Sequence, residues 1–158
     1  MAVLVAETTG WGSWTSRITQ DGEDLTELRI STFRTKGSFE LEGETYSVEP
    51  EGFWGHHAVL QKGATVIARA EKASLTRRRF NITSAGHQLK LESRSFSGRE
   101  YVLLLGGQEV GWIRAEGLMK KRVTLEFPDE VPVFLQLFLT YLVLAQSKRE
   151  AAAAAAGS

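Results

Sequence analysis

The chain has 158 residues, 42% of them apolar, with 19 Lys and Arg balancing 19 Asp and Glu, and it contains no cysteine. This length fits one domain with a single core, and the lack of cysteine excludes disulfides and thiolate metal sites. A formal charge of zero argues against a dedicated nucleic-acid-binding protein. The start, MAVLVAETTGWG, has neither the basic first residues nor the apolar length of a secretory signal, so we expect a cytoplasmic protein.

Dipeptides of the form X-Gly separate runs of strand-forming residues along most of the chain. Apolar and polar residues alternate on both sides of them, as at Phe39 and Leu41 before one pair and Tyr46 and Val48 after it. Glycine reaches the positive φ of primed hairpin turns at little cost, and this alternation is typical of antiparallel strands with one solvated face. The expected hairpin tips are Asp21-Gly22, Glu42-Gly43, Lys62-Gly63, Ala85-Gly86 and Gly106-Gly107. With further strands at 2–7, 14–20, 25–32 and 122–127, the sequence predicts about twelve strands.

The stretch VPVFLQLFLTYLVLA, residues 131–145, contains only two polar side chains, Gln136 and Thr140. Its apolar residues cover every direction of a helical wheel, and a helix that is apolar all round must be buried. A barrel of about twelve strands has a lumen too wide for wall side chains alone to fill. We therefore predict a mainly β fold, a closed antiparallel barrel enclosing a C-terminal helix over about residues 130–147. Asp129 is the expected N-cap, with Pro132 in the first turn.

The alternative interpretation of this stretch is a membrane span, with Lys148 and Arg149 as a positive flank. A span usually needs about 20 apolar residues, more than this run offers, so we expect no transmembrane helix. We assign residues 1–147 to a single barrel domain and treat 148–158 as a low-complexity tail. Its alanines can extend the helix, and a remnant of cloning explains them equally well.

Two basic runs are the candidate binding residues. Residues 1–51 contain ten acidic and four basic residues, whereas 52–158 contain nine and fifteen. Arginine holds phosphate bidentately and lysine supplies a point charge, so clusters in the basic half can hold a phosphorylated headgroup or an anionic surface. The alternative is that these are solvated charges at strand entries. The candidates are Lys72, Arg77, Arg78, Arg79, Lys120, Lys121 and Arg122.

Other chemical signals are weak. His56 and His57 are adjacent, so on a strand they face opposite sides, and with His87 they do not form a zinc site; we expect no metal and no cofactor. Glu40, Glu42 and Glu44 alternate around a turn as a solvated face. With no nucleophile motif or phosphate-binding loop in the sequence, we expect no enzyme activity. The remaining candidates are aromatic residues that suit either a stacking platform or barrel packing: Trp11, Trp14, Phe53, Trp54 and Trp112.

Three stretches carry a family resemblance: RRRFNITSAGHQLKLES (77–93), REYVLLLGGQEVGWI (99–113) and EFPDEVPVFLQLFLTYLVLA (126–145). With the strand rhythm, they resemble the tubby C-terminal-like superfamily, most closely the LURP-one-related proteins and more distantly the phospholipid scramblases. The resemblance implies a barrel threaded by its C-terminal helix and, as in tubby proteins, phosphoinositide binding on a basic face. The chain lacks the tubby lipid-binding constellation and the cysteine-rich and proline-rich segments of scramblases.

The functional prediction is a non-enzymatic, cytoplasmic barrel that binds a phosphoinositide, another anionic lipid or a phosphorylated ligand, peripherally at a membrane. A protein-interaction or scaffold barrel without a small ligand is the alternative. A scramblase-like membrane protein is the third hypothesis.

Overall fold

The computed structural model describes residues 2–9, 14–31, 35–51, 57–73, 79–95, 99–116 and 122–157. These residues form twelve strands and one helix. Their bounds are β1 (Ala2–Thr9), β2 (Trp14–Gln20), β3 (Glu23–Ile30), β4 (Gly37–Leu41), β5 (Glu44–Glu51), β6 (His57–Lys62), β7 (Thr65–Lys72), β8 (Arg79–Ser84), β9 (His87–Ser93), β10 (Glu100–Leu105), β11 (Gln108–Glu116), β12 (Arg122–Phe127) and α1 (Val133–Ala156).

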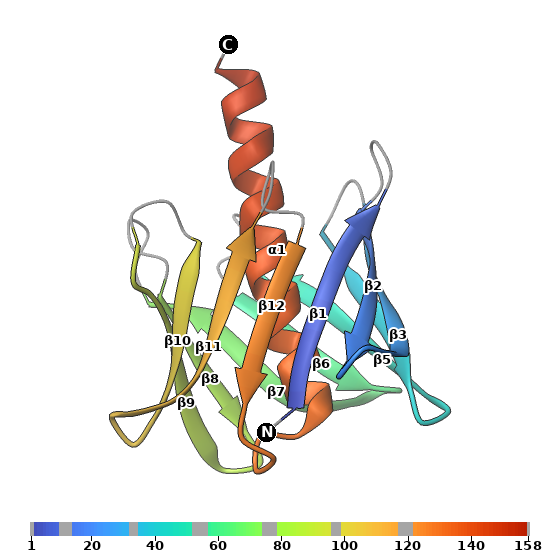
Figure 1. The fold of residues 1–158 in the computed structure, drawn as a ribbon, viewed down its shortest axis with the longest axis vertical. Coiled ribbons are helices and arrows are strands. Elements are labelled where there is room, and N and C mark those ends of the chain that lie inside the picture. Colours follow the sequence, from blue (N-terminus) through green and yellow to red (C-terminus); the bar gives the residue numbers. More distant parts are fainter. Residues whose placement is uncertain are drawn as a thin grey trace.

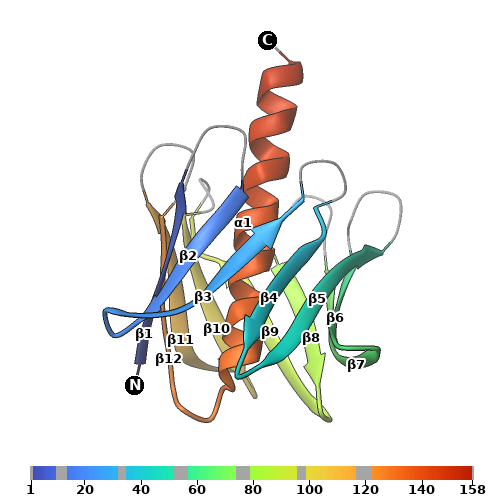
Figure 2. The same ribbon diagram turned by 90° about the vertical axis from the view of Figure 1, so that its right-hand side faces the viewer.

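The strands form a closed antiparallel barrel around α1 (Figures 1 and 2). Each strand pairs with its neighbours in the sequence, and β1 closes the sheet by pairing with β12, from Ala2 opposite Phe127 to Glu7 opposite Arg122. Closure removes the free sheet edges that would otherwise template aggregation. The predicted fold class, a mainly β closed barrel with a C-terminal helix, is confirmed.

Consecutive connections alternate between the two ends of the barrel. At one end, here called the hairpin end, lie the two-residue turns and the segment 128–132 that leads from β12 into α1. The other end, here called the helix-exit end, is where α1 leaves the barrel and its last turns project beyond the strands (Figures 1 and 2). At that end the chain crosses between strands through segments 10–13, 31–36, 52–56, 73–78, 94–99 and 117–121.

Four of the five predicted turns occupy the predicted X-Gly pairs, with positive φ at both residues, as at Asp21 (49°) and Gly22 (86°). The prediction of Lys62-Gly63 is wrong by one residue. Lys62 belongs to β6, and Gly63, with φ of 59°, is the first central residue of the turn. Glycine-first pairs suit type II′ turns and glycine-second pairs suit type I′, so a single glycine permits either position.

The first turn also corrects a strand boundary. β3 runs from Glu23 to Ile30 rather than over 25–32, because Gln20 pairs with Glu23 directly across the turn. The tight turn therefore adds two polar residues, Glu23 and Asp24, to the start of the strand, and the apolar pattern alone does not predict them.

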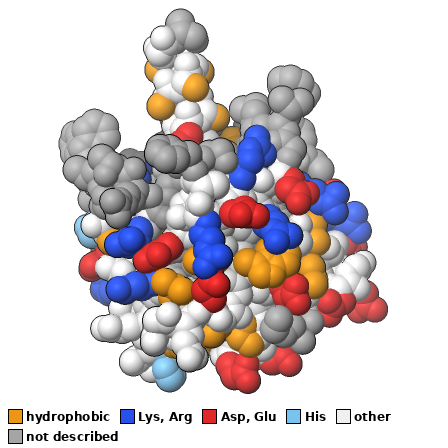
Figure 3. All heavy atoms as spheres, turned by 60° about the vertical axis from the view of Figure 1, so that its left-hand side comes forward, with side chains coloured by type: hydrophobic (Ala, Val, Ile, Leu, Met, Phe, Trp, Pro, Cys, Tyr) orange, Lys and Arg blue, Asp and Glu red, His pale blue; other side chains and the backbone are white. Residues whose placement is uncertain are grey.

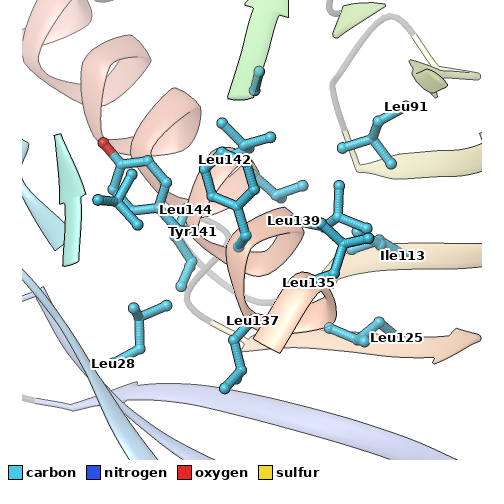
Figure 4. Close-up of a cluster of buried hydrophobic side chains, with 14 of the residues drawn as sticks. Leu28, Leu91, Ile113, Leu125, Leu135, Leu137, Leu139, Tyr141, Leu142 and Leu144 are labelled. Carbon is cyan, nitrogen blue, oxygen red and sulfur yellow. The ribbon is translucent and has the colours of Figure 1, made fainter. Parts of the chain in front are cut away.

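Helix α1 fills the lumen as predicted. Every residue from Leu135 to Ala145 is buried, so no face of this segment is solvated. In Figure 4, Leu139 points toward Ile113 of β11, while Tyr141 points to the other side of the helix. The helix continues without interruption to Ala156, through the alanine tail. Side chains from the helix and from the whole circumference of the wall thus form one core.

The start of the helix differs from the prediction. Pro132, not Asp129, occupies the N-cap position, and it supplies no side-chain hydrogen bond. Instead the Pro132 carbonyl accepts from the N–H groups of Leu135 and Gln136, both at 3.0 Å, and Gln136 Nε2 donates to the Val131 carbonyl at 2.9 Å. Asp129 lies inside the turn in which the Val131 N–H donates to the Pro128 carbonyl. It therefore precedes the helix by too many residues to occupy the N-cap position. A buried glutamine therefore ties the first turn to the preceding chain.

The wall is not uniform. Between β3 and β4 the described residues form only two register pairs, Arg29 with Ser38 and Ile30 with Gly37. Toward the hairpin end no further register pairs join β3 and β4 among the described residues, and a depression of about 340 Å³ lies on the wall between Thr26 and Glu40. The Thr26 hydroxyl bridges this gap by donating to the Glu40 carbonyl at 2.5 Å. Among the described residues, this seam has the fewest register pairs of any in the barrel.

Candidate functional site

The described members of the predicted basic clusters lie at the helix-exit end. Lys72 is the last residue of β7, Arg79 the first of β8, and Arg122 the first of β12. The other four predicted residues, Arg77, Arg78, Lys120 and Lys121, lie outside the described residues. The strand ends that flank both basic runs therefore belong to the same end of the barrel.

The two runs are not brought into contact by the described residues, because β9 and β10 separate β8 from β11 in the wall. Arg79 Nε lies 3.1 Å from Glu92 Oε1 and is compensated by it. Arg122 is exposed, is flanked in register by Glu7 and Glu116, and forms no ion pair within the described part of the chain. The strand walls at this end thus carry charges of both signs.

A third basic pair, which the sequence analysis missed, lies between the two runs. Arg94 and Arg99 bound the connection from β9 to β10, and both are exposed. The Ser95 hydroxyl accepts from the backbone N–H of Arg99 at 3.0 Å and of Glu100 at 3.3 Å, which shapes this connection. The sequence could have predicted this position. In a meandering barrel every second connection lies at the same end, and counting the hairpins along the chain therefore groups these arginines with both predicted runs.

The same parity reveals a charge asymmetry along the barrel axis. Among the described residues, the connections at the helix-exit end contain the basic residues Lys36, Arg94 and Arg99 and no acidic one. The sequence between the same strands contains five more basic residues and no acidic one, all outside the described residues: Arg34, Arg77, Arg78, Lys120 and Lys121. The connections at the hairpin end contain acidic residues and no basic ones; these are Asp21, Glu42, Asp129 and Glu130. Formal neutrality therefore conceals an uneven distribution of basic and acidic residues between the two sets of connections.

Helix α1 brings two further cations to the helix-exit end. Lys148 Nζ donates to the Ser31 carbonyl at 2.7 Å, and Arg149 Nη2 donates to Thr35 Oγ1 at 3.2 Å. Burial, and secondarily the nearby Arg149 guanidinium, lower the pKa of Lys148. Both side chains are half-buried and clamp the connection between β3 and β4.

The remaining candidates behave as wall or surface residues where they are described. His57 and His87 are exposed, and the described residues contain no cluster of three or more potential metal ligands. Trp14 packs against the core, whereas Trp112 lies partly exposed in the wall. The others, His56, Trp11, Phe53 and Trp54, lie outside the described residues. Among the helices described, none is long and apolar enough to cross a membrane.

Comparison of the chain with protein-family models, with curated proteins and with solved structures gave no match.

Proposed function

We propose that the protein is a non-catalytic binding protein whose helix-exit end docks on an anionic phospholipid surface. The observation that carries this proposal is the axial charge asymmetry. In the sequence, the connections assigned to the helix-exit end contain eight basic and no acidic residues, three of the eight being described, and the connections at the hairpin end contain four acidic and no basic residues. Such a molecule is oriented by a negative surface, which attracts one end and repels the other.

The wall restricts where this attraction acts. On the side of the barrel that carries β9, β10 and β11, Lys and Arg side chains alternate with Asp and Glu (Figure 3). Salt bridges such as Arg79–Glu92 at 3.1 Å and Arg114–Glu100 at 3.3 Å neutralise much of the wall charge. Lys36 and Arg94, in the connections, are likewise paired with Glu49 and Glu109, so the proposal depends on the further basic residues that the sequence has in these connections.

The resemblance to tubby-like and LURP-one-related proteins supports the same proposal, because phosphoinositide binding is a property of tubby proteins. Phosphoinositide headgroups and other anionic lipids share the chemistry required here, a phosphate that lysine and arginine can hold. The proposal includes attachment at the membrane surface, with the barrel remaining outside the bilayer.

The test is co-sedimentation with vesicles of neutral phosphatidylcholine alone, with phosphatidylserine added, or with a phosphoinositide added, each at low and high salt. Wild type is compared with Arg77/Arg78/Lys120/Lys121→Gln. The matched control is Arg17/Lys62/Arg69/Lys90→Gln, which removes the same charge from the wall and the hairpin end. Because each basic residue near an anionic surface contributes about 1 kcal/mol, the first variant should lose roughly a thousandfold in partitioning.

Salt-sensitive binding that the first variant loses and the control keeps supports the proposal. Equal losses in both variants would indicate attraction without orientation and would overturn it. Absence of binding to every vesicle also overturns it and favours a protein partner. Phosphoinositide binding well above that of phosphatidylserine at equal charge would identify the headgroup as the ligand.

A further inference from the structure

The outer wall carries a depression of about 340 Å³ where β10, β11 and β12 meet, and Arg94 of the β9–β10 connection lines part of it. It lies beside an irregularity in pairing between Leu103 and Leu104 of β10. Gly111 lies at its base, where an added Cβ would stand 2.0 Å from the Phe127 ring and 2.6 Å from the Glu126 carbonyl. Because Phe127 belongs to the buried core, the space that a Gly111 side chain would need is filled from inside the barrel, and β12 approaches β11 closely at the depression.

Trp112 presents its ring in this depression. Ile113 and Ala115 are buried and face the barrel interior. Because side chains alternate along a strand, Trp112 and Arg114 lie on the outer face of β11. The Arg114 Cζ atom lies 4.5 Å from the centre of the Trp112 ring, and Arg114 Nε lies 3.3 Å from Glu100 Oε1. The wall thus already holds one guanidinium between an indole face and a carboxylate, an arrangement that is attractive through both the ring quadrupole and the ion pair.

Two of the three carboxylates around the depression are paired with arginines, and the third is not. Arg114 is paired with Glu100, and Arg94 is paired with Glu109. Glu126, half-buried and directly opposite Trp112 in the β11–β12 register, forms no ion pair within the described part of the chain. A partly desolvated carboxylate beside an indole ring favours a positive group in the space between them.

We infer that this depression binds an arginine side chain of a partner protein, with its guanidinium between Trp112 and Glu126. A guanidinium can lie over an indole ring while its N–H groups bond a carboxylate, as Arg114 does with Trp112 and Glu100. A lysine ammonium is a hydrated point charge and fits this arrangement less well. The volume is at the lower end of the range of about 300–1,000 Å³ for ligand pockets, so it admits one side chain. Since the depression lies on the outer wall, an arginine exposed on the surface of a partner protein can reach it. Arg114 is the intramolecular competitor.

The experiment is an NMR titration of the 15N-labelled protein with the peptide acetyl-Gly-Arg-Gly-amide, following the Trp112 indole N–H, assigned with a Trp112→Phe variant. Peptides with lysine or with citrulline, the uncharged isostere of arginine, replace the arginine in parallel titrations. We expect a saturable shift with arginine, weaker binding with lysine and no binding with citrulline.

Three variants locate the site. Glu126→Gln should weaken arginine binding roughly two- to fivefold, the size of one exposed charge contact, while Glu130→Gln, in the connection to α1, leaves it unchanged. Arg114→Gln should tighten binding, because it removes the internal competitor and frees Glu100. Glu→Gln keeps the side-chain shape and Arg114 is exposed, so all three variants should fold, and the dispersion of each spectrum reports whether the barrel is intact.

Citrulline binding as tight as arginine binding, an unchanged affinity in Glu126→Gln, or lost affinity in Arg114→Gln would each overturn the inference. The site is independent of the lipid proposal, since Glu126→Gln should bind anionic vesicles like wild type.

Discussion

The Tyr141 hydroxyl of α1 donates a 2.5 Å hydrogen bond to the carbonyl of Thr35, a residue 106 positions earlier in the chain. Thr35 is β-branched and has a φ of 53°, a conformation that such residues adopt only when their surroundings impose it. Arg149 contacts the Thr35 hydroxyl and Lys148 the Ser31 carbonyl. The helix therefore holds Ser31 and Thr35 in place beside the β3–β4 seam, and it links the core to the helix-exit end.

Gly37 begins β4 at the point where the Tyr141 ring meets the wall. An added Cβ would lie 2.8 Å from Tyr141 Cδ2, so Gly37→Ala should lower the free energy of unfolding by about 1–3 kcal/mol through overpacking. Denaturant titration measures this. In a Tyr141→Leu background the same substitution should cost less, because the ring is gone. An equal cost in both backgrounds would show that the loss has another origin.

Gly111→Ala should be the more damaging glycine substitution. Its Cβ would meet the Phe127 ring and also the Glu126 backbone carbonyl, which cannot rotate away. We expect a loss of about 4 kcal/mol or more, the range reached only by severe core disruption. Thermal melts of both alanine variants side by side check the order. A smaller loss than in Gly37→Ala would contradict the close approach of β12 to β11.

Leu139→Asp should unfold the domain, because Leu139 is 0% exposed in the middle of the lumen and the carboxylate would be buried without a partner. Circular dichroism and thermal denaturation provide the measurement. The matched control is Ala154→Asp, in the exposed part of the same helix, which should leave the melting temperature nearly unchanged. Native-like melting of Leu139→Asp would refute the threaded helix.

The sequence predicts the hairpins and the helix well because both signals are local. Alternation and X-Gly pairs require only neighbouring residues, and the apolar side chains of residues 135–145, interrupted only by Gln136 and Thr140, cover every face of the helix and therefore predict its burial. Turn type at Gly63 and the capping of α1 were missed because they depend on backbone conformations that more than one neighbouring residue can supply. A one-residue uncertainty there changes no strand pairing.

The candidate sites depend on relations between strands, and the sequence reveals these unequally. The grouping of Arg94 and Arg99 with the predicted basic runs follows from hairpin parity alone. The pairing of Trp112 with Glu126 requires the β11–β12 register, which no single strand specifies. The sequence alone therefore predicts which residues share an end of the barrel, but it does not predict which side chains meet across neighbouring strands of the wall.

The seam between β3 and β4 should open more readily than the other seams. β1 and β2 share six register pairs from Leu4 to Thr9, whereas β3 and β4 share two among the described residues. Native-state hydrogen exchange should show lower opening free energies for amides of residues 23–28 and 39–41 than for those of β1. Thr26→Val, which removes the bridge to Glu40, should lower them further by about 1 kcal/mol. Uniform protection around the barrel would contradict this.

Tyr141 should make the stability of the barrel fall at alkaline pH. Burial raises its pKa above the ordinary 10.0, and Arg149 and the bond to Thr35 offset part of this rise. Well below pH 10 the phenol is protonated in both states, so its contribution is complete. As pH rises further the unfolded chain loses the proton first, and the free energy of unfolding decreases until the folded pKa is passed.

Lys148 has the opposite sign, because its lowered pKa means that the folded state releases its proton first. Its contribution therefore increases with pH toward 10.5, and since the side chain is half-exposed the effect is small. Tyr141→Phe isolates the tyrosine, since it keeps the ring against Gly37 and removes only the titrating hydroxyl. Denaturant titrations from neutral pH upward should show the advantage of wild type over Tyr141→Phe to be constant up to about pH 10 and to shrink above it. A constant difference across this range would mean that the hydroxyl ionises in the folded barrel as easily as in the unfolded chain.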